Sequence, residues 1–182
     1  MGPPRAKIPS ILLCLGIGFG LAIPGSQAAD DSLEYQVKAA FLLNFAKFVE
    51  WPASAFPEPD SPISICILGV DPFGKTLDQL IAGESVNGRK LAIERVKRTP
   101  PPKSCQVLFL SKAERETNKT LPALGPGVLT VGEGDNFVHE GGVIGFIIEN
   151  RRVRFDINQT AAENAELKLS SKLLSVARSV EK

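Results

Sequence analysis

Histidine, methionine and cysteine are scarce in this sequence. Its 182 residues include one His, three Cys and one Met, which is the initiator. A single His excludes a metal site built from several His side chains, and removal of the initiator would leave no thioether ligand. The 21 basic and 20 acidic side chains nearly cancel, which argues against a large positive surface for nucleic acid. We therefore predict a chain with no metal, no cofactor and no nucleic-acid partner.

A hydrophobic run long enough to span a bilayer is also missing. The longest apolar run, Ile11–Ile23, is shorter than the roughly 20 residues that a spanning helix needs, and glycines interrupt it. Basic residues precede the run, and a Pro-Gly pair with small residues up to Ala28 follows it. This layout is typical of a secretory signal peptide over residues 1–28, which predicts export and cleavage near Ala28. An uncleaved anchor is the alternative.

Residues 29–182 are predicted to form a single exported α/β domain. A hydrophobic content of 43% and a charged content of 23% are typical of a globular chain. Capping boxes are expected to open helices at Asp31, Ser111 and Thr160. Periodicity predicts strands and longer helices. The predicted strands are 63–68, 90–96, 105–110, 128–131, 143–149 and 153–157, and the longer helices run from 31 to Pro52, over 73–81 and over 170–180.

The order of these elements indicates the fold. Early strands separated by helices favour parallel pairing with right-handed crossovers. The Asn150-Arg151 turn joins the last two strands as an antiparallel hairpin, and Asn87-Gly88 marks another turn. We expect a single mixed β-sheet, with parallel early strands, a late antiparallel hairpin at one edge and helices on both faces.

One segment fits a nucleotide-binding pattern. Residues 69–76 have the glycine spacing of a P-loop, end in Lys75 and Thr76, and lie between a strand and a helix. Two residues oppose this interpretation, because Pro72 lacks a backbone N–H and Asp71 places a carboxylate where polyphosphate would lie. The structural alternative is a turn in which Asp71 caps the following helix and Pro72 occupies its first position.

Other catalytic signals are weak. His139 is the only candidate general base of its kind, and no Gly-x-Ser-x-Gly nucleophile elbow accompanies it. The acidic residues are scattered, and no pair stands out as a glycosidase dyad. We therefore expect no enzymatic activity.

Cys66 and Cys105 remain after predicted cleavage, and an exported pair tends to oxidise. Both lie on predicted strands that can be neighbours, so a disulfide requires a register that brings their Cα atoms within about 7 Å. Three roles stay open at this point: a structural cross-link, a redox-sensitive switch, or two buried free thiols.

The sequence contains more large apolar and aromatic side chains than one buried helix face requires, and it also contains a cluster of arginines. The first long helix is rich in aromatic residues, the last helix has an apolar face, and arginines cluster at the predicted hairpin. The apolar groups are explained either by core packing or by an exposed patch for a partner. The arginines are explained either by a solvated edge or by a contact patch for a partner. The candidate partner-binding residues are Phe45, Phe48, Trp51, Leu173, Val176 and Arg152.

The stretch from Val37 to Pro52 resembles the opening signature of the YfiR family of periplasmic proteins. The resemblance continues in order over nearly the whole predicted mature chain, and Cys66 and Cys105 are similar to the disulfide-forming pair of the best-studied type. The similar blocks are 65–69, 71–74, 86–89, 129–132, 137, 141–142, 155–158 and 169–174.

This resemblance implies a non-enzymatic, dimeric regulator of the periplasm. The best-studied type holds an inner-membrane diguanylate cyclase inactive through the periplasmic part of the cyclase, and an outer-membrane lipoprotein can sequester it. The resemblance therefore implies lower cyclic-di-GMP signalling and less biofilm. Two alternatives stay open: a binding module for a histidine kinase or a small amphipathic ligand, and a nucleotide-binding enzyme that uses Lys75 and Thr76.

Overall fold

The computed structural model describes residue 2 and residues 25–97, 104–112 and 117–182. Most of the predicted signal peptide lies outside the described residues, and so does Glu114 of the capping box predicted at Ser111. Within the described part, no helix combines the length and the apolar character that crossing a membrane requires.

Eight strands form one mixed sheet, as predicted. Five neighbouring strands from β7 to β4 run parallel, while the β7–β8 and β3–β4 pairs are antiparallel hairpins. In spatial order the strands are β10 (Ser179–Glu181), β8 (Arg152–Asn158), β7 (Ile144–Glu149), β6 (Leu129–Glu133), β5 (Cys105–Leu110), β2 (Ile63–Leu68), β4 (Arg89–Val96) and β3 (Ser85–Val86). A separate antiparallel pair joins β1 (Val49–Glu50) to β9 (Lys168–Leu169).

The central strands explain the apolar runs of the sequence. All six residues of β2 and all six of β5 are buried. Successive side chains of a strand point to opposite faces of the sheet, and both faces are covered here. The outer strand β4 is half-buried over most of its length. The sheet therefore has two cores, one on each face.

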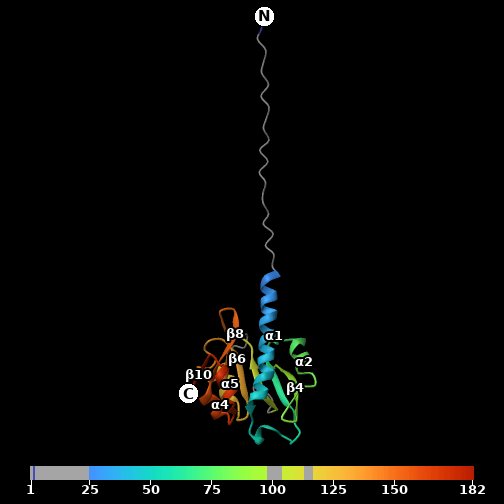
Figure 1. Ribbon diagram of the computed structural model, residues 1–182, viewed down its shortest axis with the longest axis vertical. Coiled ribbons are helices and arrows are strands. Elements are labelled where there is room, and N and C mark those ends of the chain that lie inside the picture. Colours follow the sequence, from blue (N-terminus) through green and yellow to red (C-terminus); the bar gives the residue numbers. More distant parts are fainter. Residues whose placement is uncertain (1, 3–24, 98–103, 113–116) are drawn as a thin grey trace.

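The longer helices cover one face of the sheet (Figure 1). Phe45 of the first helix is fully buried against Phe146 and Phe155, with ring centroids 5.7 and 5.0 Å away. The first part of this helix extends beyond the sheet (Figure 1). The helices of this face are α1 (Gly25–Phe48), α2 (Lys75–Ile81), α4 (Gln159–Asn164) and α5 (Ser171–Val176).

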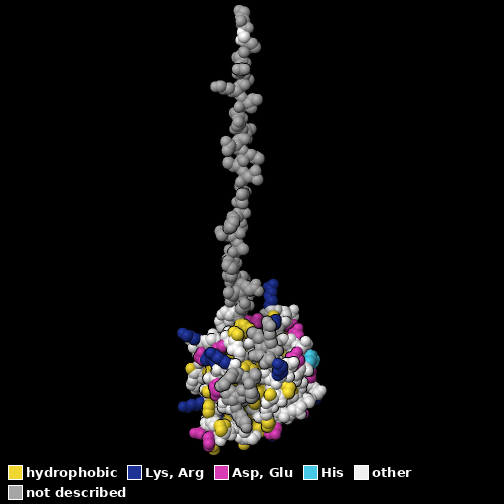
Figure 2. All heavy atoms as spheres, turned by 180° about the vertical axis from the view of Figure 1, so that it is seen from behind, with side chains coloured by type: hydrophobic (Ala, Val, Ile, Leu, Met, Phe, Trp, Pro, Cys, Tyr) yellow, Lys and Arg dark blue, Asp and Glu magenta, His cyan; other side chains and the backbone are white. Residues whose placement is uncertain are grey.

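Short elements and loops cover the opposite face. The segment with α3 (Thr117–Thr120) and η2 (Leu121–Ala123) packs against this core through Leu121. Phe137 is clamped between Gly132 and Gly142, where an added Cβ would lie 2.2 and 2.1 Å from its ring. On this side, hydrophobic, basic and acidic side chains are intermixed (Figure 2). The remaining short helix, η1 (Ala53–Ala55), follows β1.

The predicted final helix over 170–180 is wrong beyond Val176. The chain becomes extended at Ala177, and β10 then pairs in parallel with β8, so the hairpin is not the outermost element. Arg178 and Ser179 both donate hydrogen bonds to the Asp156 carboxylate on β8. Pairing with the exposed edge of β8 satisfies backbone groups that a continued helix would have bonded internally. Periodicity in so short a segment cannot reveal that edge.

Three predicted caps are also corrected. The helix α1 begins at Gly25 and runs through Asp31, which therefore does not cap it. The cap of α4 is Asn158, whose Oδ1 accepts a hydrogen bond from the N–H of Ala161 at 2.7 Å, in place of Thr160. The N-cap of α2 is Gly74 rather than Asp71.

Candidate functional site

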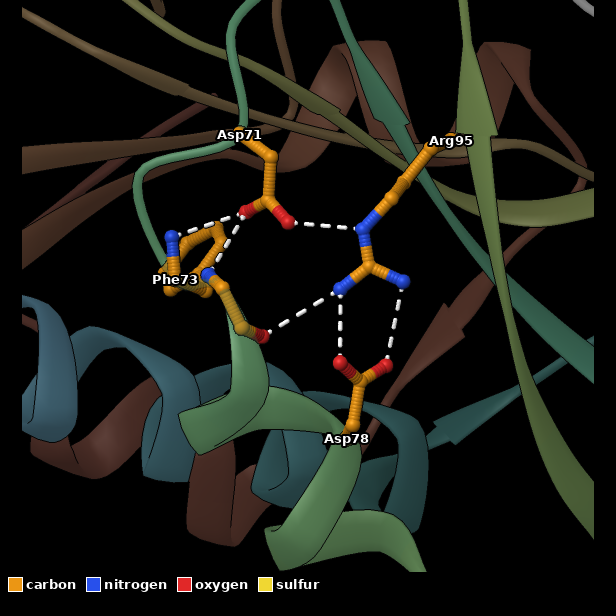
Figure 3. Close-up of polar contacts among 5 residues, drawn as sticks. Asp71, Phe73, Asp78 and Arg95 are labelled. Atoms are coloured by element: carbon orange, nitrogen blue, oxygen red, sulfur yellow. Dashed lines mark hydrogen bonds and ion pairs between the residues drawn. The ribbon is translucent and has the colours of Figure 1, made fainter.

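The P-loop-like turn is closed by its own carboxylate. Oδ1 of Asp71 accepts hydrogen bonds from the backbone N–H groups of Phe73 and Gly74, at 2.8 and 3.2 Å (Figure 3). Oδ2 of Asp71 accepts from Nε of Arg95 on β4 at 2.8 Å. A P-loop needs such backbone donors for phosphate. Here two of them already bind a carboxylate, which leaves Lys75 beside an occupied anion site.

Arg95 completes this closed network. Its guanidinium also donates to both carboxylate oxygens of Asp78 on α2 and to the carbonyl of Gly74 (Figure 3). These contacts raise the pKa of Arg95, first through the hydrogen bond with Asp78 and then through that with Asp71. The network connects the turn and α2 to strand β4 of the sheet, so its role is structural.

His139 has a surface carboxylate as its partner. The side chain is exposed, and its Nδ1 lies 3.3 Å from Oε2 of Glu181 on β10. A catalytic triad also places a carboxylate at Nδ1, but it further requires a hydroxyl or thiol nucleophile bonded to Nε2. Among the described residues, no such group hydrogen-bonds to His139.

Cys66 and Cys105 form a disulfide whose Cα atoms are 5.7 Å apart. The two residues lie on the adjacent strands β2 and β5, and both are buried. The carboxylate of Glu94 lies within 4.8 Å of both sulfur atoms. Metals bind cysteine as the thiolate, so the oxidised pair is no ligand set. The buried position supports a structural cross-link.

Four of the six candidate partner-binding residues point at least partly into the protein. Phe45 and Leu173 are fully buried in the core under the helices, so their side chains offer no surface to a partner. Phe48 and Trp51 are half-buried, and Nε1 of Trp51 donates to the carbonyl of Gln106 at 3.1 Å. Helical spacing alone does not separate the buried residues of an aromatic helix from its exposed ones.

A groove between α1 and the β7–β8 hairpin collects exposed apolar side chains. Among the described residues five large hydrophobic side chains are exposed, and three of them line this groove: Leu33 (60%), Val37 (38%) and Ile148 (52%). Its volume is about 570 Å³. We call it the α1–hairpin groove; its lining residues are Leu33, Glu34, Val37, Phe41, Ile148, Arg151, Arg152 and Val153.

Both walls of the groove follow from local structure. Along α1, Leu33, Val37 and Phe41 recur every four residues and so share one side of the helix. On the hairpin, Ile148 and Val153 form a cross-strand pair on the face that α1 covers further down. The helix and the hairpin both extend past the body of the sheet (Figure 1), and between them Ile148 stays exposed while Val153 is half-buried.

The basic residues of the groove lie at the tip of the hairpin. Asn150 and Arg151 form the two-residue turn with φ of 50° and 60°. Within the described part of the chain, neither Arg151 nor the neighbouring Arg152 forms an ion pair. Their guanidinium groups therefore remain available to an external carboxylate.

A buried ion pair fixes the α1 wall. Lys38, whose side chain is only 5% exposed, donates to the carboxylates of Glu34 and Glu133. Glu133 ends β6 and also accepts from the backbone N–H of Lys112 at 2.8 Å. The lining of the α1–hairpin groove holds one carboxylate, Glu34, against the guanidinium groups of Arg151 and Arg152, so its net charge is positive.

The sequence profile of the YfiR/HmsC-like family matches residues 35–178, which is most of the chain. The chain belongs to the YfiR/HmsC-like family. Members of this family are known as periplasmic regulators rather than catalysts. The predicted resemblance is thereby confirmed.

A solved structure supports the fold of this YfiR/HmsC-like chain. A conserved domain protein from Vibrio cholerae matches with a TM-score of 0.50 at 12% sequence identity. The match covers 81% of this chain and 60% of the Vibrio protein. No curated protein matches in sequence. At this identity the likeness concerns the fold alone.

Sequence reasoning found part of the groove in this YfiR/HmsC-like protein. It named Arg152 and the arginine cluster, but it missed Leu33, Val37 and Ile148. Helical spacing places Leu33 and Val37 on the same stripe as buried residues of the first helix, so it gives no sign that these two are exposed. The length of α1 could have indicated these exposed residues, because a helix that is longer than the sheet beneath it leaves some of its apolar positions uncovered.

Proposed function

We propose that this YfiR/HmsC-like protein is a periplasmic regulator that inhibits an inner-membrane diguanylate cyclase and so lowers cyclic-di-GMP signalling. The observation that carries the proposal is the family match over residues 35–178. The regulator acts by binding the periplasmic part of the cyclase. An outer-membrane lipoprotein that sequesters it, and a homodimer as its working state, belong to the same proposal.

The geometry supports regulation by contact more than turnover of a substrate. The donors of the P-loop-like turn already bind Asp71, and among the described residues no hydroxyl or thiol hydrogen-bonds to His139. In contrast, the α1–hairpin groove combines exposed apolar side chains with arginines that form no ion pair with any described residue. Surfaces of this kind are typical of protein interaction sites.

Gene deletion in the host tests the proposal. Loss of the gene should raise cyclic-di-GMP, and a plasmid copy of the full chain should restore the lower level. A copy without residues 2–28 provides the matched control, because it keeps the domain but lacks the predicted signal peptide and should not restore that level. Cyclic-di-GMP that is unchanged by both deletion and overexpression would contradict the cyclase as target.

A second candidate function is the sensing of a small amphipathic ligand, or binding to a histidine kinase. The volume and apolar lining of the α1–hairpin groove favour the ligand version. A thermal-shift screen tests it, since a ligand that binds only the folded protein raises its melting temperature. No stabilisation at saturating ligand would remove this alternative.

A further inference from the structure

We infer that the α1–hairpin groove binds an amphipathic helix of the partner protein, with large apolar side chains on one face and Asp or Glu along its flank. This inference rests on the proposed function and names the surface and the partner chemistry. Three features of the groove carry it, which are its side-chain walls, its charge and the backbone of the hairpin tip.

The walls of the groove select a helix rather than a strand. A bound strand is recognised mainly by backbone hydrogen bonds along a sheet edge. The groove instead exposes side chains, namely the stripe Leu33–Val37 of α1 and Ile148 of β7. A helix in such a groove inserts apolar anchors spaced by three or four residues between the two walls.

The charge of the groove selects an acidic flank. Arg151 and Arg152 border the apolar walls and have no ion pair within the described chain, and they outnumber Glu34, the one carboxylate of the lining. Arginine forms planar, bidentate hydrogen bonds with carboxylates. A helix with a basic flank would meet two like charges beside the apolar contact, so the groove discriminates against it.

The backbone at the tip supports a binding role for Arg151. Its φ of 60° lies in the left-handed region, where glycine is free of strain and a residue with a Cβ loses about 1 kcal/mol. Strained residues of this kind cluster at functional sites. The turn holds an arginine at the mouth of the groove although glycine would fit the turn better.

Two synthetic helical peptides test the inference. Both are about 18 residues long and share one leucine stripe, and they differ only in having Glu or Lys at the flanking positions. Fluorescence anisotropy with the purified exported chain should show binding of the Glu peptide and weaker or no binding of the Lys peptide. Raised salt should weaken the Glu complex.

Variants assign the binding to the groove. The double change Arg151→Glu with Arg152→Glu should weaken the Glu peptide at least about tenfold, and Leu33→Glu should do the same. Val70→Glu is the matched control, because Val70 is 66% exposed and lies outside the groove. Thermal melting checks that every variant is folded.

Other outcomes would overturn the inference. These are equal binding of both peptides, binding of neither, or equal loss in Val70→Glu. A wild-type dimer that Leu33→Glu converts to monomer would show that a second copy fills the groove. Binding to phosphatidylglycerol vesicles that the Arg variants abolish would assign the surface to lipid.

Cyclic-di-GMP measurements separate the inference from the proposed function. If the wild-type chain lowers cyclic-di-GMP in the deletion strain and the groove variants lower it equally, the inference fails while the proposed function stands. If the wild-type chain itself has no effect, the proposed function fails.

Discussion

The two hairpins of the sheet use the same turn but fill it differently. In the β3–β4 hairpin the turn is Asn87-Gly88, with φ of 51° and 81°. In the β7–β8 hairpin it is Asn150-Arg151, with φ of 50° and 60°. Two-residue turns with both φ values positive match the twist of the strands and favour Asn-Gly. The first turn follows this preference, whereas the second places a long cation in the glycine position.

The surroundings of the two hairpins differ in the same direction. The β3–β4 hairpin adjoins β2, and near its turn Glu84 pairs with Lys47 while Arg89 donates to the carbonyls of Glu58 and Ser61. The tip of the β7–β8 hairpin lies beside α1, with the exposed Ile148 and two arginines, Arg151 and Arg152, that form no ion pair with any described residue. The side chains beside the first turn thus stabilise the fold itself, whereas those at the second tip are the ones that the inferred partner helix would contact.

Substitutions at the base and at the tip of the β7–β8 hairpin should differ most in the stability that they cost. Phe155 is buried against Phe41 and Phe45, so Phe155→Ala should lower the free energy of unfolding by about 4 kcal/mol. Ile148→Ala on the same face should change it by less than about 0.5 kcal/mol, because Ile148 is exposed. Urea denaturation measures both. Equal losses would mean that the groove is part of the core.

Removing the disulfide tests the strand beside the first hairpin. Cys66 and Cys105 are 39 residues apart, and in the chain-entropy model such a cross-link stabilises by up to about 4 kcal/mol. The Cys66→Ala and Cys105→Ala double variant should lose stability of this order in urea denaturation. Once folded, it should bind the acidic peptide like the wild type. A selective loss of binding would instead point to a redox switch.

The ion pair between Asp156 of β8 and Arg178 should make the stability of the protein depend on pH. Burial alone would raise the pKa of Asp156, but hydrogen bonds from Arg178 and Ser179 outweigh it and the pKa is lowered. The stabilisation by the ionised carboxylate is therefore complete at neutral pH and is lost as the pH falls below the ordinary carboxyl range.

Asp156→Asn should thus cost about 2 kcal/mol at pH 7, because it weakens charged hydrogen bonds at a buried site. The difference from the wild type should shrink in acid. Urea denaturation at a series of pH values checks this, and a difference that is constant down to pH 2–3 would contradict the assigned cause.

The smallest effect comes from exchanging the turn residues. Arg151→Gly should raise the free energy of unfolding by up to about 1 kcal/mol, and Gly88→Arg should lower it by a similar amount. No atom lies within 4 Å of a Cβ added at Gly88, so the backbone conformation alone accounts for that cost. The stabilised Arg151→Gly variant should bind the acidic peptide more weakly. Stabilisation without weaker binding would remove the functional reason for Arg151.

Local patterns predicted the parts of the fold that depend on local physics. Local patterns such as the alternation over 63–68 located β2 and β5, and both Asn-containing turns are recognisable from their residues. The disulfide also became plausible once the two cysteines were assigned to neighbouring strands. Predictions failed where a segment met a distant part of the chain. The end of the last helix became β10 because the edge of β8 was open to pairing.

The α/β class, the oxidisable cysteine pair, the apolar helix and the basic hairpin can be predicted from residue type and short spacing alone. Three features became visible only in the folded chain: which side chains of α1 are buried, that Arg95 closes the P-loop-like turn, and that Leu33 and Ile148 line one groove. Each of these depends on the position of α1 or β4 over residues far away in the chain, and periodicity carries no information about such distances.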